Sequence, residues 1–224
     1  MHQHTSQQFE SELRELKDTL LAMGGRCERA IRTAMRALEE RNVDLAEEVQ
    51  RADRLVNAAE LEVDDRAERI LALRQPMGRD LRFVLTALKV VTDLERIGDE
   101  AVNLAERAED LAKATAVPQV IDHLPEMAEM ATAMLHDSLD AFLEEHAENA
   151  RKVLLMDDEV DDAYGRILRE CLEFMTNNSS GIHSAMAVAS SAKYLERIAD
   201  HATNIAEMVV YLARGEDVRH KGKR

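Results

Sequence analysis

The sequence predicts an all-α protein of six long helices, built as two copies of a three-helix unit. Hydrophobic residues make up 46% of the 224 positions, charged residues 33% and aromatic residues only 3%. Helix-favouring Ala, Leu, Glu, Arg and Met are abundant, and few stretches are β-branched enough for strands. Apolar residues recur with a helical period almost throughout the chain, and one thirteen-residue segment occurs twice.

Three prolines and a few polar runs divide the chain into these helices. Pro76, Pro118 and Pro125 punctuate the chain, and the period between such breakers is helical. The predicted helices span residues 6–40, 43–74, 78–114, 122–145, 147–176 and 180–214. Helices of this length exceed the ~11–12 residues usual in globular proteins and are typical of a bundle.

Residues at the predicted joints agree with these boundaries. Asn42 can cap the helix that begins at residue 43, and the polar run 176–181 offers a cap for the last helix. Gly215 follows the last apolar turn, where a C-terminal glycine is expected. Gly24 and Gly25 interrupt the first helix, which predicts a kink or a close helix crossing there.

The repeat is the clearest sign of internal organisation. Leu94–Glu106 and Leu195–Glu207 share nine of thirteen residues at a constant offset of 101. A weaker similarity relates Ala52–Glu60 to Met156–Tyr164. We therefore expect two domains, the first three-helix unit in residues 1–116 and the second in residues 117–224.

The formal net charge of −15 bears on possible partners. It repels phosphate backbones and anionic lipid, so we expect no nucleic acid partner, and a cationic protein surface or metal ions fit better. No apolar stretch is long enough to span a membrane, and residues 1–13 lack a signal-peptide core, so we expect no direct membrane insertion. Cys27 and Cys171 are interpreted as buried residues in a reducing cytoplasm.

Each copy of the repeated segment carries an apolar stripe and an acidic stripe beside it. On a helix of 3.6 residues per turn, Leu94, Ile97 and Leu104 share one side. The acidic stripe consists of Glu95, Asp99, Asn103 and Glu106 in the first copy, and of Glu196, Asp200, Asn204 and Glu207 in the second. Carboxylates one turn apart repel by a few tenths of a kcal/mol, so a compensating cation is expected.

Two kinds of cation could offset this repulsion. Arg96 and Arg197 lie three residues before Asp99 and Asp200, and exposed pairs of this kind contribute ~0–1 kcal/mol. The alternative is a divalent metal ion, because carboxylate and Asn oxygens suit hard cations and also iron in carboxylate-bridged clusters. The sequence leaves both explanations open.

The second predicted helix of each unit adds further oxygen ligands one turn apart. They are Asp53 with Asn57, and Asp157 with Asp161. The predicted metal-ligand set is Glu95, Asp99, Asn103, Glu196, Asp200, Asn204, Asp53, Asp157 and Asp161. Carboxylates at this spacing can bridge ions ~3.5–4 Å apart, and we expect Mg, Mn, Fe or Zn.

The histidines are not expected to be ligands. His201 follows Asp200 but lies ~100° around the helix from it, so it is interpreted as a surface residue. His136 and His183 have no partner at ligand spacing.

Four charged residues are candidates for contact with a partner protein. They are Arg96, Arg197, Asp80 and Arg82. The last two lie in the turn "RQPMGRDLR", where Asp80 could instead cap the following helix or pair with Arg82.

These motifs together resemble the PhoU family of phosphate-signalling regulators. The similarity is carried by "DLERIGD" (Asp93–Asp99) and "YLERIAD" (Tyr194–Asp200), with "VDLAEEVQRADRLVN" (Val43–Asn57), "RQPMGRDLR" (Arg74–Arg82) and "GEDVRH" (Gly215–His220) in the same order. Each motif is weak alone, but their order and spacing are specific and cover nearly the whole chain.

The resemblance implies six long antiparallel helices that form two three-helix bundles related by a pseudo-twofold axis. It implies a cytoplasmic negative regulator, not an enzyme, that contacts the phosphate transporter ATPase subunit and a sensor histidine kinase. Metal clusters of some members would map to Glu95 with Asp99 and to Glu196 with Asp200. The pair Asp53 and Asn57 departs from an all-acid pattern. We also expect a homodimer, because long amphipathic helices often leave a second apolar face.

Two other functions are compatible with a helical bundle. A carboxylate-bridged di-iron oxidase would require a Glu-x-x-His motif from each of two helices, and the sequence contains none. A metal-free scaffold would leave the acidic stripes in water. Direct phosphate binding is not expected, since the chain is acidic and lacks a glycine-rich anion-binding loop.

Overall fold

The computed structural model describes residues 2–216 and 218, and side chains from residue 7 onward. Within this part of the chain there are six α-helices, two short 3₁₀ helices and no strand, so the predicted all-α fold is confirmed. The α-helices are α1 (His2–Glu40), α2 (Val43–Arg74), α3 (Gly78–Ala112), α4 (Leu124–Glu144), α5 (Ala147–Asn177) and α6 (Ile182–Arg214). The 3₁₀ helices are η1 (Gln119–His123) and η2 (Ser179–Gly181).

Several helix ends have the residues expected of them. The Asn42 side chain accepts hydrogen bonds from the backbone N–H groups of Asp44 and Leu45, which confirms it as the cap of α2. Gly215 ends α6 in the left-handed conformation, with φ of 70°. The polar run 176–181 does not cap α6, because it forms η2 and Gly181 precedes α6 without a side-chain cap. At the start of α5, Nδ1 of His146 accepts a hydrogen bond from the backbone N–H of Asn149 and caps that helix.

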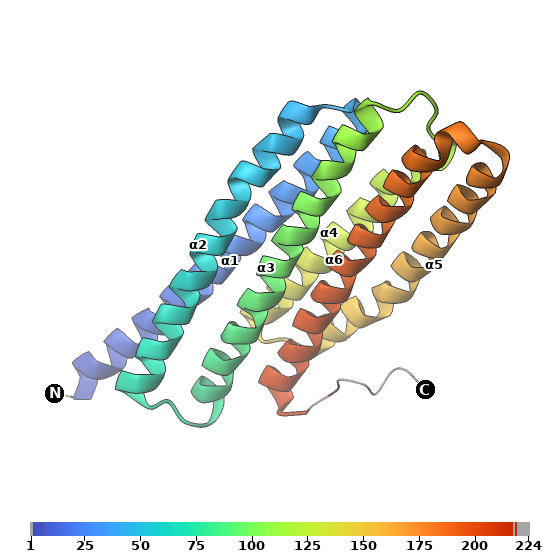
Figure 1. The fold of residues 1–224 in the computed structure, drawn as a ribbon. Helices are drawn as coiled ribbons and strands as arrows, with labels where there is room; N and C mark the ends of the chain where they lie inside the picture. The colour runs from blue at the N-terminus through green and yellow to red at the C-terminus, as the bar shows by residue number, and fades with distance from the viewer. Residues whose placement is uncertain (1, 217, 219–224) are drawn as a thin grey trace.

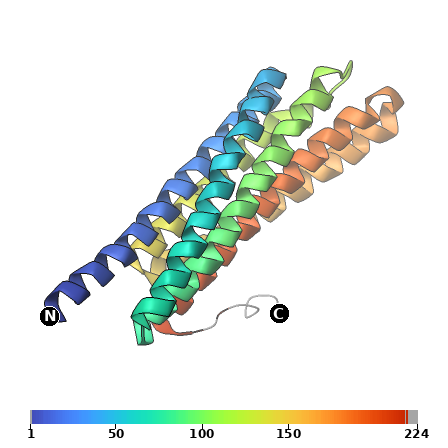
Figure 2. The same cartoon turned by 60° about the vertical axis from the view of Figure 1, so that its left-hand side comes forward.

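The helices lie side by side in two groups of three (Figures 1 and 2). Helices α1, α2 and α3 pack on one another, and α4 and α5 pack on α6. The two groups meet mainly where α3 lies antiparallel to α6 at the centre of the molecule (Figure 1), and also where α1 packs against α4. Buried residues of all six helices form one continuous core, which includes the unpaired Cys27 and Cys171.

A glycine permits the close approach of α1 to α4. A Cβ atom built on Gly24 would overlap Cδ1 of Leu139, so a larger residue would force that side chain to move. The crossing alternative predicted for Gly24 is therefore the one observed, and α1 continues unbroken through it.

None of the described helices is both long and apolar enough to cross a lipid bilayer. The domain division at residues 116 and 117 falls in the connection between α3 and η1, and it stays a prediction.

Candidate functional site

The first group of acids lies between α2 and α3, and we call it the first cluster. It contains Asp53, Glu60, Glu95 and Asp99, which are linked by mutual repulsion. Gly98 lets α2 approach α3 here, since a Cβ on it would lie 3.1 Å from Oδ1 of Asp53. That oxygen is buried and has no hydrogen-bond partner among the described residues, whereas Oδ2 accepts from Asn57 at 2.9 Å.

Burial and like charge both act on the first cluster. Burial, followed by the charge of Asp99, raises the pKa of Asp53 above its usual range, against a lowering by the Asn57 hydrogen bond. The pKa of Glu95 is raised by burial and then by Asp99, Glu60 and Asp53, and only Arg96 opposes the shift. Burial and repulsion from Asp64 and Asp99 raise the pKa of Glu60. The ionised cluster thus carries electrostatic strain that a cation would relieve.

The second cluster lies at the matching position between α5 and α6. It contains Asp157, Asp161, Glu196 and Asp200. Burial raises the pKa of Asp200, with further contributions from the other three carboxylates, while Lys193 acts in the opposite direction.

The second cluster also holds its own cation and an additional hydrogen bond. Nζ of Lys193 lies 2.5 Å from Oε2 of Glu196 and 5.3 Å from the centre of the Tyr164 ring. The hydroxyl of Thr203 donates to Oδ1 of Asp157 at 3.2 Å. Repulsion among these acids is therefore partly offset within the chain.

Arginine does not compensate the two central aspartates. Arg197 reaches across to α3, where its Nη1 lies 3.0 Å from Oε1 of Glu100, rather than toward Asp200. Neither Asp99 nor Asp200 forms an ion pair with an arginine within the described part of the chain. Of the two explanations that the sequence leaves open, pairing with Arg96 or Arg197 is thus not the one observed.

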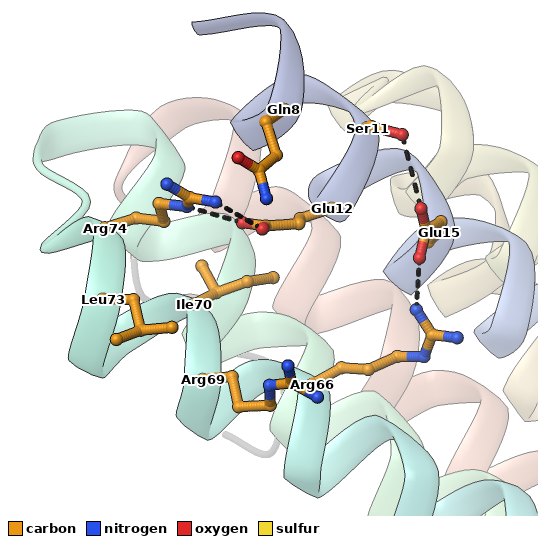
Figure 3. Close-up of a pocket in the computed structure, with 9 residues that line it drawn as sticks. All are labelled: Gln8, Ser11, Glu12, Glu15, Arg66, Arg69, Ile70, Leu73 and Arg74. Carbon is orange, nitrogen blue, oxygen red and sulfur yellow. Dashed lines mark hydrogen bonds and ion pairs between the residues drawn. The ribbon is translucent and has the colours of Figure 1, made fainter. Parts of the chain in front are cut away.

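Elsewhere in the molecule, arginines do neutralise acids on a neighbouring helix. In a hollow between α1 and α2 (Figure 3), Arg74 donates two hydrogen bonds to Glu12, of 2.8 and 2.6 Å. Arg66 lies 2.6 Å from Glu15 in the same hollow. The hydrogen bonds from Arg74 lower the pKa of Glu12, the reverse of the shift in the first cluster. Glu12 therefore has a neutralising arginine on the neighbouring helix, whereas Asp53 and Glu95 of the first cluster have raised pKa values.

Two predicted ligands instead make contacts at the centre of the molecule. Nδ2 of Asn204 donates to Oδ1 of Asp93 on α3 at 3.2 Å. Nδ2 of Asn103 donates to Oε2 of Glu100 at 3.2 Å. Their amide groups therefore bond to buried acids of α3.

The interpretation of His201 as a surface residue is wrong. Its Nδ1 lies 2.8 Å from Oδ1 of Asp93, and its side chain is only 14% exposed. The side of α6 that lies ~100° from Asp200 faces α3 of the other unit, and sequence spacing within one helix cannot show this. The sequence did contain a sign of this contact: Asp93 and Glu100 are acids within the apolar run of α3, where a buried carboxylate needs a polar partner from another helix.

The turn between α2 and α3 does not contain the predicted cap or pair. Met77 precedes α3 with no side-chain cap, and Asp80 lies within the first turn. No ion pair joins Asp80 to Arg82 in the described structure, and Nε of Arg82 is buried without a hydrogen-bond partner there. The proposal that these two residues contact a partner remains a prediction.

A model of the PhoU domain matches residues 20–108 and 124–209, which together make up most of the chain. This chain belongs to the PhoU family. A "Phosphate-specific transport system accessory protein PhoU homolog" of Pseudomonas putida is 41% identical over 219 residues, covering 98% of this chain and 86% of that protein. The Escherichia coli K12 "Phosphate-specific transport system accessory protein PhoU" is 34% identical over 222 residues, with 99% and 92% covered.

Solved PhoU structures have the same fold. The crystal structure of PhoU from Pseudomonas aeruginosa superposes with a TM-score of 0.89 at 38% sequence identity, covering 93% of this chain and 100% of that chain. The "phosphate transport system regulatory protein PhoU" from Streptococcus pneumoniae gives a TM-score of 0.88 at 30% identity, with 94% and 99% covered. The resemblance deduced from the repeated motifs is thereby confirmed.

In this PhoU-family chain, a groove of about 940 Å³ runs along α3, α5 and α6, and it is lined by Asp99 of the first cluster and by Asp157, Asp161 and Asp200 of the second. Both predicted arginines, Arg96 and Arg197, line it together with seven carboxylates. The carboxylates are those of Asp99, Glu100, Asp157, Asp158, Asp161, Asp200 and Glu207. The groove thus favours cationic ligands over anionic ones.

The first cluster has the donor chemistry that a hard divalent cation requires. It offers only oxygen atoms, among them the buried and unpartnered Oδ1 of Asp53. In the described side chains, however, no three His, Cys, Asp or Glu groups already converge on a metal position. Binding would therefore require side-chain rotation, which the long Glu60 and Glu95 side chains permit. The absence of Cys and His from both clusters favours Mg or Mn, and carboxylate-bound Fe, over Zn.

Proposed function

We propose that this protein is a negative regulator of the phosphate-starvation response and a modulator of a high-affinity phosphate ABC transporter. It would act as an adaptor between the transporter ATPase subunit and a sensor histidine kinase. The observation that carries this proposal is the match of the whole chain to relatives named as accessory proteins of phosphate-specific transport. The proposal places the protein in the cytoplasm, where both partner surfaces are accessible, and as a homodimer.

Divalent cations held by the clusters are the second part of the proposal. The raised pKa values of Asp53 and Glu95 support this part of the proposal, because among the described residues only Arg96 is a cation that lowers the pKa of Glu95, and none lowers that of Asp53. A bound ion would remove this repulsion, fix α2 against α3, and present a defined surface to a partner. Metal bound to the native state would also raise the apparent stability by mass action.

We propose a regulatory rather than catalytic role. The chain lacks the Glu-x-x-His pairs of di-iron enzymes, and its relatives carry accessory names. Ferroxidase activity of the iron-loaded protein, followed as an absorbance change with oxygen, would support the enzyme alternative.

The adaptor role is tested in a strain that lacks this gene and carries a reporter for a phosphate-starvation promoter. We expect the reporter to be active in phosphate-rich medium and to be silenced by the wild-type gene. Reporter silence in the deletion strain itself would contradict the proposal.

A pull-down tests the partners and the cation separately. Purified protein is mixed with the transporter ATPase subunit or the sensor kinase, with Mn²⁺ or with EDTA. The informative variant is Glu95→Gln/Asp99→Asn, and Glu47→Gln/Glu48→Gln on α2 removes the same charge as a control. Binding that is insensitive to EDTA and to the first variant would favour a metal-free scaffold.

A further inference from the structure

The chain enters the acidic groove again after α6 has ended. Glu216 forms an ion pair of 3.4 Å with Arg151 in the first part of α5. Val218 then packs against the core and lines the groove together with Leu154 and Leu155, one turn further along α5. From residue 216 to residue 218 the chain therefore advances along α5 toward its acidic stretch.

That stretch presents several carboxylates directly beyond Val218. Asp157, Asp158 and Asp161 follow Leu155 on α5 and line the same groove, with Asp200 on α6 opposite them. Both Asp158 and Asp161 are exposed. Within the described residues, the groove carries seven carboxylates against two arginines, and Arg197 already pairs with Glu100.

The six residues that follow Val218 have the opposite charge. Their sequence, "RHKGKR", contains four permanently cationic side chains and one histidine, in a chain whose net charge is −15. They lie outside the described residues. An acidic groove and a basic segment that begins at its edge are electrostatically complementary.

The segment is also long enough. On a helix, the six-residue advance from Leu155 to Asp161 is about 9 Å at 1.5 Å per residue. Six extended residues span up to ~20 Å at ~3.3 Å per residue. Because the segment is covalently attached, its effective concentration at the groove is in the millimolar range, so even weak ion pairs can hold it there.

We propose that residues 219–224 dock in this groove as an intramolecular ligand, placing their cationic side chains on Asp157, Asp158 and Asp161. Docking itself does not depend on the proposed function, but its consequence rests on that function. If the groove receives a cationic partner surface or metal ions, the basic segment competes with them and shields the groove while no partner is bound. A partner must then displace residues 219–224 before it binds.

A labelled peptide measures the docking directly. A variant that ends at Glu216 and the intact protein are titrated into a fluorescein-labelled peptide of residues 217–224 in EDTA at about 20 mM salt, and fluorescence anisotropy is recorded. We expect the truncated protein to bind at least 5-fold more tightly than the intact protein, whose groove is already filled. Binding should be largely lost near 0.5 M salt through screening.

Matched variants of the truncated protein locate the site. Asp157→Asn/Asp158→Asn/Asp161→Asn should weaken peptide binding at least 5-fold, whereas Asp64→Asn/Asp65→Asn/Glu68→Gln on α2, with the same change in charge, should not. A peptide with Gln in place of Arg219, Lys221, Lys223 and Arg224 should not bind. Equal affinities of the intact and truncated proteins, or equal losses in the two triple variants, would overturn the proposal. No metal or partner is present, so failure of the adaptor role leaves this result unaffected.

Discussion

Between α2 and α3, the acids of the first cluster lie together on a segment that has Thr92 where the segment of the second cluster, between α5 and α6, has Lys193. A second substitution lies next to the lysine. Glu60 of the first cluster corresponds to Tyr164, whose ring lies against the lysine. Since Asp161 in turn corresponds to Asn57, each cluster keeps four carboxylates, and the second cluster alone adds a lysine.

The aspartates contributed by α2 and α5 differ as well. Asp53 lies against Gly98, and its buried Oδ1 has no hydrogen-bond partner in the part of the chain that the structure describes, but Asp157 accepts a hydrogen bond from Thr203. Gly98 and Val102 of α3 correspond to Ala199 and Thr203 of α6. The comparison indicates that the two halves keep similar carboxylates and differ in how the negative charge is offset. The second cluster supplies part of its own compensating cation, whereas a cation that offsets the first cluster would have to come from solution.

The largest expected difference is in metal affinity when one cluster is removed. Glu95→Gln/Asp99→Asn should weaken Mn²⁺ binding roughly 100-fold, about 2.7 kcal/mol, because the strained cluster is lost. Glu196→Gln/Asp200→Asn should change the tightest binding event less than about 3-fold. Isothermal titration of tag-free protein measures both. Equal losses from the two variants would mean that the clusters are equivalent.

Removing the lysine from the second cluster, or adding one to the first, should change the difference in Mn²⁺ affinity between the two clusters. Lys193→Gln should strengthen Mn²⁺ binding at the second cluster about 10-fold, since Glu196 loses its cation. The reciprocal change Thr92→Lys should weaken binding at the first cluster about 10-fold. Each is measured by titration in a protein whose other cluster has been neutralised. An unchanged affinity in both would show that this lysine does not control cation binding.

A single methyl group should affect the first cluster less. Gly98→Ala places a Cβ 3.1 Å from both Asp53 Oδ1 and Val56 Cγ1, so the carboxylate must shift by a few tenths of an ångström. The gain in helix propensity, about 1 kcal/mol, offsets the crowding. We expect Tm to change by less than ~3 °C and the Mn²⁺ affinity to fall about 5-fold. Ala199→Gly is the control and should leave the affinity of the first cluster unaltered.

The smallest expected effect is on stability as a function of pH. Since the folded pKa of Asp53 is raised above its ordinary value of 3.8, the ionised group costs stability at neutral pH, and this cost disappears below pH 3.8. Asp53→Asn should therefore raise Tm by roughly 2 °C at pH 7 in EDTA, and by progressively less as the pH falls toward 4. Thermal melts of both proteins across this range measure the difference. A constant difference at all pH values would rule out the carboxylate charge as its cause.

Most of the fold could be predicted from the sequence. The six helices follow from apolar periodicity and from residues such as Asn42 and Gly215, whose effects are local. The predicted start of the first helix, residue 6, was wrong, since α1 begins at His2. The boundaries missed at Ala112, before Leu124 and before Ile182 lie where 3₁₀ turns or irregular backbone adjoin the helix. Such ends depend on tertiary packing as much as on local propensity.

The candidate site was only partly predictable. Turn spacing correctly grouped Glu95 with Asp99 on one helix, because i,i+4 geometry is fixed. It could not show that Lys193 lies over Tyr164 or that Asn204 contacts Asp93, since those contacts depend on how helices pack. Glu60 was missed because its corresponding residue is Tyr164, so the repeat gave no signal for it.

Anomalous diffraction from Mn²⁺-soaked crystals tests the central asymmetry most directly. We expect a strong manganese peak between α2 and α3, within ligand distance of Asp53 and Asp99. Beside Lys193, between α5 and α6, we expect a peak of clearly lower occupancy or no peak. Peaks of equal height at the two positions, or a peak at the second position alone, would contradict it.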